Sequence, residues 1–414
     1  MTTNPRLSQV GIEKLGAYAG TLAVDLLALA RHRDHDPKDI SDNLLVTSRS
    51  INPLWEDPVT MAINAAKGLL TDADREAIEL VIVATESSVD QSKAMSTYAH
   101  RFLGLKPNCR NYEAKHACYG ATSAVMMAAH WLASGVAPGR KALVIATDQS
   151  RESLNEHYEY VMGAGAVALL LSEEPRVLQL DLTKNGYFTC EALDTFRPTS
   201  RVETGNNEVS LFSYLDALEG AYQHFLSKAG PIDLDAFFQW HLYHVPFGGM
   251  AFQAHRTALR HWRSLKKSEA YAHFSRKVLP SLRYNMQLGG TYSASTFFAL
   301  LGLVDSCPDV KPGDRVSLFS YGSGSGGEFY PGVIGPDARA ACAAVNLQAQ
   351  LDARRVVTLE EYETLERERQ RLIDCGDYVP THDVPAGHYA ERYAGRGALV
   401  FQGIKNHFRE YGWS

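Results

Sequence analysis

Short, nearly continuous apolar runs recur along the chain between longer segments rich in alanine, methionine and leucine. Four runs have the length and the Val/Ile/Leu content of strands: residues 80–84, 142–147, 166–171 and 316–321. Apolar runs without polar alternation are typical of strands covered on both faces. We therefore expect a sheet that lies between other layers.

The segments between these runs predict helices. Residues 58–70, 122–134 and 291–304 are rich in small and apolar side chains, and the charged segment 358–371 predicts a solvated surface helix. Polar segments at 198–207, 335–339 and 374–387 predict loops. Strands that alternate with helices indicate a layered α/β fold.

Composition and charge exclude several classes of protein. The 414 residues are 45% apolar and 21% charged, with a net charge of −6, which is ordinary for a globular protein. No global basic excess points to nucleic acid or to an anionic membrane. No apolar run approaches the length of a membrane span, and the N-terminus lacks the apolar core of a signal peptide. We therefore expect a cytoplasmic protein that binds neither nucleic acid nor membrane.

The cysteines are scattered, and none forms a C-x-x-C pair. This spacing favours neither a zinc site nor a disulfide framework. One thiol can then be reactive while the others fill the core. The six are Cys109, Cys118, Cys190, Cys307, Cys342 and Cys375.

Cys118 lies in KHACYGA, just before the helix expected to begin near Thr122. A thiol at a helix N-terminus is expected to have a lowered pKa, because the helix dipole favours the thiolate. The free N–H groups there can also hold an oxyanion. The alternative is a buried structural cysteine.

Glu86 follows the apolar run 80–84 directly, in VATESS. A carboxylate at the end of a strand sits where α/β proteins place their sites. Partial desolvation there would raise its pKa and make it a useful general base. The alternative is an ordinary loop glutamate.

Three histidines are close together at His241, His244 and His255. The H-x-x-H spacing is too short for a helical metal pair and no Glu or Cys is near, so a zinc site is not expected. The Val-Pro-Phe-Gly-Gly sequence after His244 predicts a turn, which places His244 at a loop edge. The alternative is a histidine satisfied by hydrogen bonds.

The glycine-rich segment SYGSGSGG at 320–327 follows the last apolar run. It lacks the Gly-Lys-Ser/Thr end of a P-loop and the acidic partner strand of a dinucleotide site. We interpret it as a tight turn that lines an active site.

Six motifs together resemble the 3-hydroxy-3-methylglutaryl-CoA (HMG-CoA) synthase family of the thiolase superfamily, in the family's order and spacing. They are VIVATESSVDQSKA, YEAKHACYGAT, LVIATDQSR, GAGAVALL, YHVPFGGM and LFSYGSGSGGEFY. The resemblance implies a thiolase-like five-layer αβαβα fold of two similar halves, with the boundary placed after Ser172 (residues 1–172 and 173–414). It also implies a homodimer.

The resemblance further implies the roles of single residues. Cys118 would take an acetyl group, Glu86 would remove a proton from its methyl group, and His244 would hold or protonate the acceptor oxygen. The backbone N–H groups of Cys118 and Ser323 would form the oxyanion hole. No metal or redox cofactor is implied. Tyr321, Ser295 and Gly290 would lie with Ser323 at the substrate or its oxyanion. Glu113 and Asp148 are further residues within matching motifs.

The family has two branches, one acting on acetyl-CoA and acetoacetyl-CoA, the other on acyl groups of carrier proteins during polyketide β-branching. The first typically carries lysines in H-V-P-F-x-K-M-x-K-K, and lysines suit the phosphates of CoA. This chain has Gly249, Phe252 and Gln253 at those places. The resemblance therefore favours the polyketide branch, with an acetyl carrier protein as donor and a β-ketoacyl carrier protein as acceptor. The acyl groups would arrive on phosphopantetheine.

Two details concern the partners. Arg31 and Arg33 are the candidate docking cations for an acidic carrier protein, since they would lie near the mouth of the pantetheine tunnel. Gly290 stands where the family often has an asparagine that helps hold the acceptor carbonyl. The sequence suggests that this contact is left open.

Three other functions remain as alternatives. The first is an HMG-CoA synthase of primary metabolism. The second is a non-catalytic carrier-protein binding module, against which the full set of Glu86, Cys118 and His244 argues. The third is a β-ketoacyl synthase, whose Cys-His-His or Cys-His-Asn set lacks a glutamate base.

Overall fold

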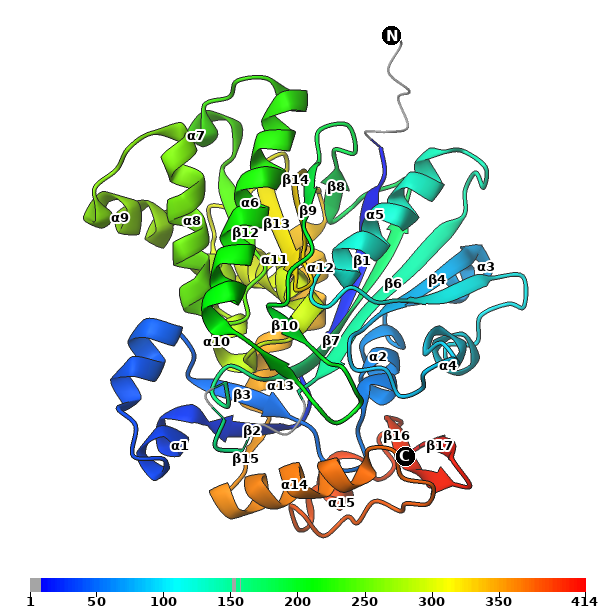
Figure 1. The fold of residues 1–414 in the computed structure, drawn as a ribbon. Coiled ribbons are helices and arrows are strands. Elements are labelled where there is room, and N and C mark those ends of the chain that lie inside the picture. The colour runs from blue at the N-terminus through cyan, green and yellow to red at the C-terminus, as the bar shows by residue number, and fades with distance from the viewer. Residues whose placement is uncertain (1–8, 151–153, 157) are drawn as a thin grey trace.

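The computed structural model describes residues 9–150, 154–156 and 158–414. In these ranges a ten-stranded mixed sheet runs through the molecule in the order β12-β13-β14-β8-β1-β7-β6-β4-β5, with β9 paired to β14 (Figure 1). Its strands are β1 (Gly11–Tyr18), β4 (Ile78–Ala84), β5 (Arg110–Ala114), β6 (Lys141–Gln149), β7 (Ala164–Ser172), β8 (Leu178–Leu180), β9 (Gly186–Thr189), β12 (Trp240–Tyr243), β13 (Arg315–Gly322) and β14 (Gly326–Ile334).

The four strands predicted from apolar runs are confirmed as β4, β6, β7 and β13. All nine residues of β7 are buried, which is the burial that a run without polar alternation predicts. In β4 and β6 the only residues that are not fully buried lie near the strand ends. The sheet is therefore covered on both faces.

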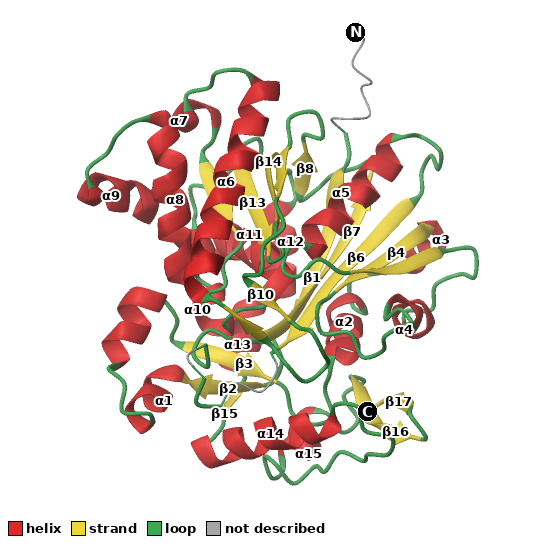
Figure 2. Ribbon diagram, in the orientation of Figure 1, coloured by secondary structure: helices red, strands yellow, loops and turns green. Residues whose placement is uncertain are grey.

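Three groups of helices build the layers (Figure 2). Helices α5 (Gly120–Ala133) and α11 (Ser295–Ser306) share the central apolar cluster with strands from both ends of the sheet. Helices α2 (Pro58–Ala66) and α4 (Ser96–Phe102) pack on the outside of one end. Helices α6 (Asn207–Ala229), α8 (Gly248–Trp262) and α9 (Lys267–Lys277) pack on the outside of the other. This is the layered α/β arrangement that was expected.

Smaller elements surround these layers. They are α1 (Leu26–His32), α3 (Asp72–Ala77), α7 (Leu234–Phe237), α10 (Asn285–Leu288), α12 (Ala338–Val345), α13 (Leu347–Asp352), α14 (Leu359–Leu372) and α15 (His388–Arg392), with the small sheets β15-β2-β3 (Arg355–Val356, Leu22–Asp25, Ser48–Ile51), β10-β11 (Thr195–Phe196, Thr204–Gly205) and β16-β17 (Leu399–Lys405, Phe408–Trp413). The C-terminal segment returns to the start of the chain, because β15 pairs with β2 and Leu399 of β16 joins the cluster of α2. No helix in the described ranges has the length and apolarity to cross a bilayer.

The structure corrects three local predictions. Helix α14 is not solvated all round, because Tyr362, Leu365 and Glu366 are fully buried on one face. The predicted loop 335–339 gives way to α12 at Ala338. The predicted loop 198–207 contains β11 and ends where α6 begins. In α14 tertiary packing overrides the local polar composition, whereas the other two differences concern the ends of predicted loops.

Candidate active site

The predicted site residues each come shortly after the end of a strand that runs parallel to a neighbouring strand. Glu86 comes after β4 and Cys118 after β5, and these strands run parallel side by side. His244 follows β12, and Ser323 follows β13, which is parallel to β12. The carboxyl ends of neighbouring parallel strands meet at one edge of a sheet. Glu86, Cys118, His244 and Ser323 accordingly line one cavity of about 690 Å³.

The loop that carries Cys118 is held close to the glycine-rich turn. Ala117, just before Cys118, has a positive φ of 41°, and helix α5 begins two residues after Cys118. A Cβ at Gly322 would lie 2.7 Å from the nitrogen of Tyr119, so only glycine lets the two loops pack this closely. The glycine-rich segment therefore supports the loop that carries the thiol.

Cys118 donates a hydrogen bond from Sγ to Oε1 of Glu86 over 3.4 Å. Burial raises the pKa of the thiol well above its ordinary value, and the negative charges of Glu86 and Asp148 add to this. The expectation of a lowered thiol pKa at the helix start is thus wrong. Desolvation and two neighbouring carboxylates outweigh the helix dipole, so the resting thiol is protonated.

The loop of Glu86 is fixed by the buried carboxylate of Asp148. Its Oδ1 accepts hydrogen bonds of 2.9 Å from the backbone N–H of Glu86 and from the hydroxyls of Thr85 and Ser87. Burial raises the pKa of Glu86 to about 7, with Arg197 opposing and Asp148 reinforcing the shift. This raised pKa, expected from the sequence, suits a general base near neutral pH.

His244 is buried at the foot of the cavity. Its Nδ1 lies 2.6 Å from the hydroxyl of Ser295, and its backbone N–H donates to the carbonyl of Phe319. Burial lowers the pKa of the imidazole to about 3, so the ring is neutral. Ser295 is fully buried behind His244 and is not among the lining residues, so its predicted place at the substrate is corrected to one of support.

Tyr321 and Gly290 line the cavity with Ser323, as predicted from the motifs. At Gly290, however, no side chain fits. A Cβ there would lie 2.6 Å from the carbonyl oxygen of Val161 and 2.8 Å from that of Pro246. The backbone itself occupies the space, and the N–H of Gly290 donates to Val161 over 2.7 Å.

Three charged residues at the site escaped the sequence analysis. Asp194 is fully buried and accepts hydrogen bonds from the hydroxyl of Tyr321 and the N–H of Gly324. Arg197 and Glu203 line the cavity as an ion pair. All three come from the polar segment between β9 and α6, which has no periodicity.

The three positions where the CoA-using branch typically has lysines, Gly249, Phe252 and Gln253, have different surroundings. A Cβ at Gly249 would collide with the backbone carbonyl of Asn43, so no side chain fits there. Phe252 packs against the rings of Tyr271 and Phe274, away from the cavity. Of the three positions, Gln253 is exposed and lines the cavity.

The two candidate docking arginines have different surroundings. Arg33 donates to both carboxylate oxygens of Glu159 and to Glu363, and its side chain is only 12% exposed. Arg31 is exposed on the same helix end. Arg31 alone of the pair presents its side chain openly to solvent, and docking through either residue stays a prediction.

The other motif residues lie outside the cavity. His255 bonds to Tyr243 and to His273, which bonds to Asp235, and His241 bonds to Ser317. These histidines serve packing, and within the described ranges no three His, Cys, Asp or Glu residues are placed to hold a metal. Glu113 accepts from the N–H of Met95 and supports the start of α4.

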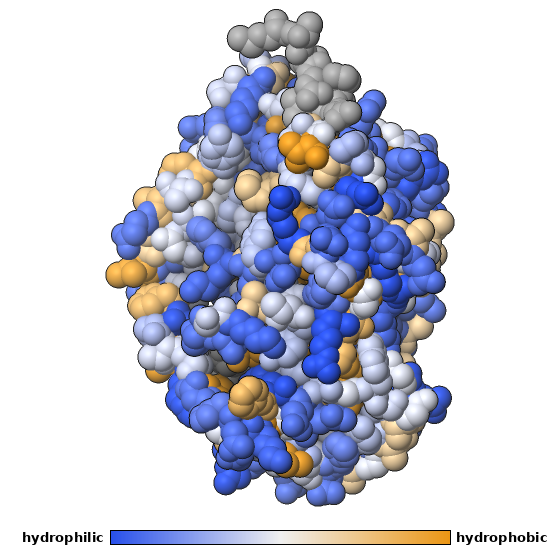
Figure 3. Space-filling view, turned by 90° about the vertical axis from the view of Figure 1, so that its right-hand side faces the viewer, coloured by the Kyte–Doolittle hydropathy of each residue, from blue (hydrophilic) through white to orange (hydrophobic). Residues whose placement is uncertain are grey.

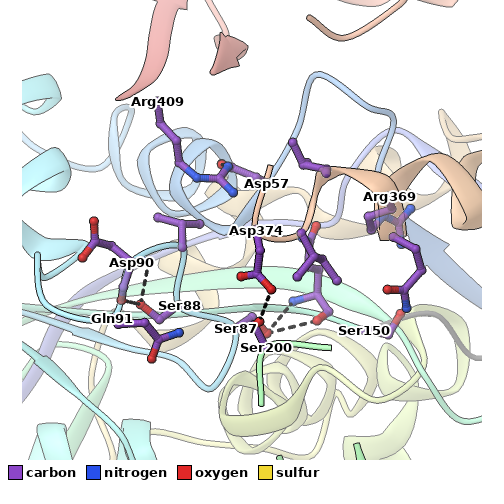
Figure 4. A pocket seen from close by; sticks show the side chains of 15 residues that line it. Asp57, Ser87, Ser88, Asp90, Gln91, Ser150, Ser200, Arg369, Asp374 and Arg409 are labelled. Atoms are coloured by element: carbon purple, nitrogen blue, oxygen red, sulfur yellow. Dashed lines mark hydrogen bonds and ion pairs between the residues drawn. The ribbon is translucent and has the colours of Figure 1, made fainter. Parts of the chain in front are cut away.

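A second cavity of about 240 Å³ lies behind the Glu86 loop, between that loop and the C-terminal segment (Figure 4). Its charged side chains already have partners: Arg409 pairs with Asp57, and Asp374 accepts from Ser200. The wall of this cavity is therefore built from structural contacts between segments distant in sequence.

Two family descriptions match the chain: the hydroxymethylglutaryl-coenzyme A synthase N terminal region over residues 6–175 and the C terminal region over residues 258–390. The polyketide biosynthesis 3-hydroxy-3-methylglutaryl-ACP synthase PksG of Bacillus subtilis is 39% identical over 368 residues, which cover 86% of this chain and 87% of PksG. The hydroxymethylglutaryl-CoA synthase of Enterococcus faecalis is 32% identical over 359 residues, covering 86% and 91% of the two chains.

Solved structures agree with these relatives. The curacin biosynthetic pathway HMG synthase in complex with holo donor-ACP superimposes with a TM-score of 0.93 at 40% identity, covering 98% of this chain and 100% of the other. The structure of PksG gives a TM-score of 0.91 at 35% identity, covering 98% and 99%. The fold is thus the thiolase-like fold of these synthases. The chain belongs to the hydroxymethylglutaryl-CoA synthase family of carbon–carbon bond-forming acyltransferases.

Proposed function

We propose that the protein is an HMG synthase of polyketide β-branching that takes acetyl from an acyl carrier protein and adds it to a carrier-bound β-ketoacyl group. The observation that carries this proposal is the contact between the Cys118 thiol and the Glu86 carboxylate in a cavity that also presents His244. Two relatives support the choice of the polyketide branch. They are PksG, which is similar in sequence, and the curacin synthase, which was solved in complex with its donor carrier protein.

The first step is transfer of acetyl to Cys118. The thiol is protonated and donates to Glu86, so we assign its proton to that carboxylate as sulfur attacks the acetyl carbonyl. The bond from carbonyl carbon to the pantetheine sulfur breaks, and the leaving thiolate takes the proton from Glu86. Glu86 is then a carboxylate again, and acetyl is held as a thioester, which acidifies its methyl group.

The second step is condensation. Glu86 removes a proton from the acetyl methyl, and the enolate carbon attacks the β-ketone of the acceptor. The neutral ring of His244 holds the ketone oxygen, and the proton now on Glu86 neutralises the new alkoxide. Water then cleaves the thioester on Cys118, which releases a carboxylic acid and restores the thiol. The product is a 3-hydroxy-3-carboxymethyl acyl group on the carrier protein.

The choice of carrier protein over CoA rests on charge. No lysine is among the described residues that line the cavity, and its one arginine, Arg197, is paired with Glu203. The phosphates of CoA need cations at the mouth. With Gly249 closed by backbone and Phe252 turned into α9, only Gln253 remains there, and it is uncharged.

Acylation by two donors tests this function. The enzyme is incubated separately with acetyl-CoA and with the acetyl-loaded donor carrier protein of the curacin pathway, and the acetyl adduct is followed by intact mass. We expect faster acylation by the carrier protein and no adduct in Cys118→Ala. No adduct on the wild type from either donor would make it a non-catalytic binding module, and faster acylation by CoA would assign it to primary metabolism.

Condensation distinguishes this mechanism from that of a β-ketoacyl synthase. Such an enzyme decarboxylates a malonyl donor and needs no glutamate base. Retained condensation in Glu86→Ala would therefore support a β-ketoacyl synthase and contradict the role given to Glu86.

A homodimer is part of the proposal. Strand β5 is the edge of the large sheet, and its first three residues, Arg110 to Tyr112, are exposed. Apolar side chains on the face of α3 and α4 lie in small separate patches (Figure 3), so strand pairing along β5 is the contact we favour. Sedimentation should give twice the mass of 45.7 kDa, and Asn111→Pro in β5 should shift it toward the monomer.

Two further points complete the proposal. The division into halves at residue 172 fits the sheet, because β1, β4, β5, β6 and β7 precede it and lie together in the strand order.

A cytoplasmic location is also part of the proposal. All six cysteines are free thiols, which fits the reducing cytoplasm.

A further inference from the structure

The hairpin of β10 and β11 crosses the wall of the active-site cavity. Its two short strands pair Thr195 with Gly205 and Phe196 with Thr204. At its base, Asp194 bonds to Tyr321 and to Gly324 of the glycine-rich turn. At its tip, Ser200 donates to Asp374 beside the end of α14, where the second cavity lies (Figure 4). The hairpin is thus tied to two segments distant in the sequence.

Arg197 is the residue that this hairpin brings to the catalytic base. Its Nη1 donates to the backbone carbonyl of Glu86 over 2.8 Å, and its Nη2 donates to the hydroxyl of Tyr292 over 3.1 Å. The Nε and Nη2 atoms of Arg197 lie 2.9 Å and 2.8 Å from Oε2 of Glu203, which comes just before β11. Every part of the guanidinium is therefore held, and its side chain is only 12% exposed.

The charges around Glu86 are unbalanced without Arg197. Acidic or neutral polar groups from each packed element face it: Cys118 before α5, Asp148 on β6, Glu203 of the hairpin and Tyr292 of the short helical turn Tyr292–Ala294. Arg197 is the one cationic side chain among the described residues lining the cavity. It lowers the pKa of Glu86, whereas Asp148 and Glu203 raise it.

We propose that Arg197 is a further positioning residue of the condensation step, which the hairpin of β10 and β11 carries to the backbone and the charge of Glu86. This inference rests on the proposed function of Glu86 as the base. Arg197 acts through Glu86 in two ways. Its hydrogen bond fixes the loop that aims the carboxylate, and its charge keeps the carboxylate ionised beside the acetyl thioester. Glu203 orients the guanidinium and partly offsets its charge.

Deuterium exchange isolates the step. Cys118 is acetylated with the acetyl-loaded curacin donor carrier protein, and the acetyl-enzyme is transferred to D2O without acceptor. Each removal of a methyl proton by Glu86 and return of a deuteron adds 1 Da, up to three, which peptide mass detects. Exchange rates are measured between pH 5.5 and 9 for the wild type, Arg197→Lys, Arg197→Met, Glu203→Gln and, as the control, Arg201→Met. Arg201 lies at the exposed tip of the same hairpin and pairs with Asp374.

The expected shifts have opposite signs. In Arg197→Met the midpoint of the pH profile should rise by about 1–3 pH units, because a nearby opposite charge is lost. Exchange at pH 7 should then fall by about fivefold or more. Acetylation of Cys118, whose proton also passes to Glu86, should be slower but should still go to completion. Arg197→Lys should lie between this variant and the wild type. Glu203→Gln should lower the midpoint, and Arg201→Met should leave it in place.

Several results would overturn the inference. An unchanged midpoint in Arg197→Met would remove the electrostatic role. An upward shift in Glu203→Gln or in Arg201→Met would show that a loosened hairpin, not the charge of Arg197, controls Glu86. If Arg197→Met does not fold, Arg197→Lys and Glu203→Gln still decide, because their midpoints must move in opposite directions. A wild-type enzyme that takes no acetyl group would instead contradict the proposed function itself.

Discussion

At the scale of single residues, burial sets the protonation of the site. The thiol of Cys118 stays protonated because it is desolvated beside Glu86 and Asp148. The same desolvation brings the pKa of Glu86 to about 7 and that of His244 to about 3. A protonated thiol, a carboxyl group with a pKa near neutrality and a neutral imidazole fit the proton transfers through Glu86 that we propose.

Exchange of the acetyl methyl protons should therefore follow the ionisation of Glu86. The base acts as the carboxylate, so the rate should rise with pH through about 7 and then level off. Glu86→Gln should lower the rate at the plateau by about 10²–10⁴-fold. Glu113→Gln, in the other acidic motif, should match the wild type, because Glu113 only supports α4. A flat profile across pH 6–8 would contradict this account.

Lysines introduced at two positions of α8 should behave differently. Gly249→Lys should lower the free energy of unfolding by about 1–3 kcal/mol, because its side chain would collide with the carbonyl of Asn43. Gln253→Lys lies on the exposed cavity wall and should stay within about 0.5 kcal/mol of the wild type. It should also speed acylation by acetyl-CoA. Thermal unfolding and acylation rates check both, and a fully stable Gly249→Lys would contradict the closed backbone.

At the scale of elements, α14 shows how a highly charged helix can be part of the core. Its exposed face carries the charges that predict a surface helix. Its other face buries Glu366, which lies 2.8 Å from Arg369 and 3.7 Å from Arg49 of β3. The helix thereby ties the C-terminal segment to the small sheet of β2, β3 and β15.

Glu366→Gln should consequently lower the free energy of unfolding by about 3–5 kcal/mol, because it removes the buried negative charge between two arginines. Glu360→Gln, on the exposed side of the same helix, should change it by less than about 0.5 kcal/mol. Urea unfolding of both variants measures the difference. Equal stabilities would mean that the buried cluster contributes nothing.

At the scale of the whole molecule, a buried carboxyl joins the first strand to the last part of the chain. Glu56 accepts from the hydroxyl of Tyr18 on β1 and also bonds to Tyr393 after α15. Burial raises its pKa from 4.5 to about 7. Because the folded pKa exceeds the unfolded one, the stability from this group is present below about pH 4.5 and is lost as the pH rises through about 7.

Glu56→Gln should remove this loss, which amounts to about 3 kcal/mol. The melting temperature of the wild type should fall more steeply between pH 5 and 8 than that of the variant. Asp57, whose pKa burial also raises, leaves a remaining slope of the same sign in both proteins. Parallel melting curves across this range would show that Glu56 does not titrate there.

The sequence alone was enough to predict the four central strands and the helices beside them, and to propose Glu86, Cys118 and His244 as site residues. These follow from local apolar runs and from motifs whose spacing along the chain is independent of the fold. The tertiary structure sets the charge state of Cys118, because desolvation depends on what packs around the thiol. It likewise closed the positions at Gly249 and Gly290 with backbone from other segments and buried one face of α14. Arg197 reaches Glu86 from a polar loop 111 residues away in sequence, and no local pattern indicates a contact made by such folding.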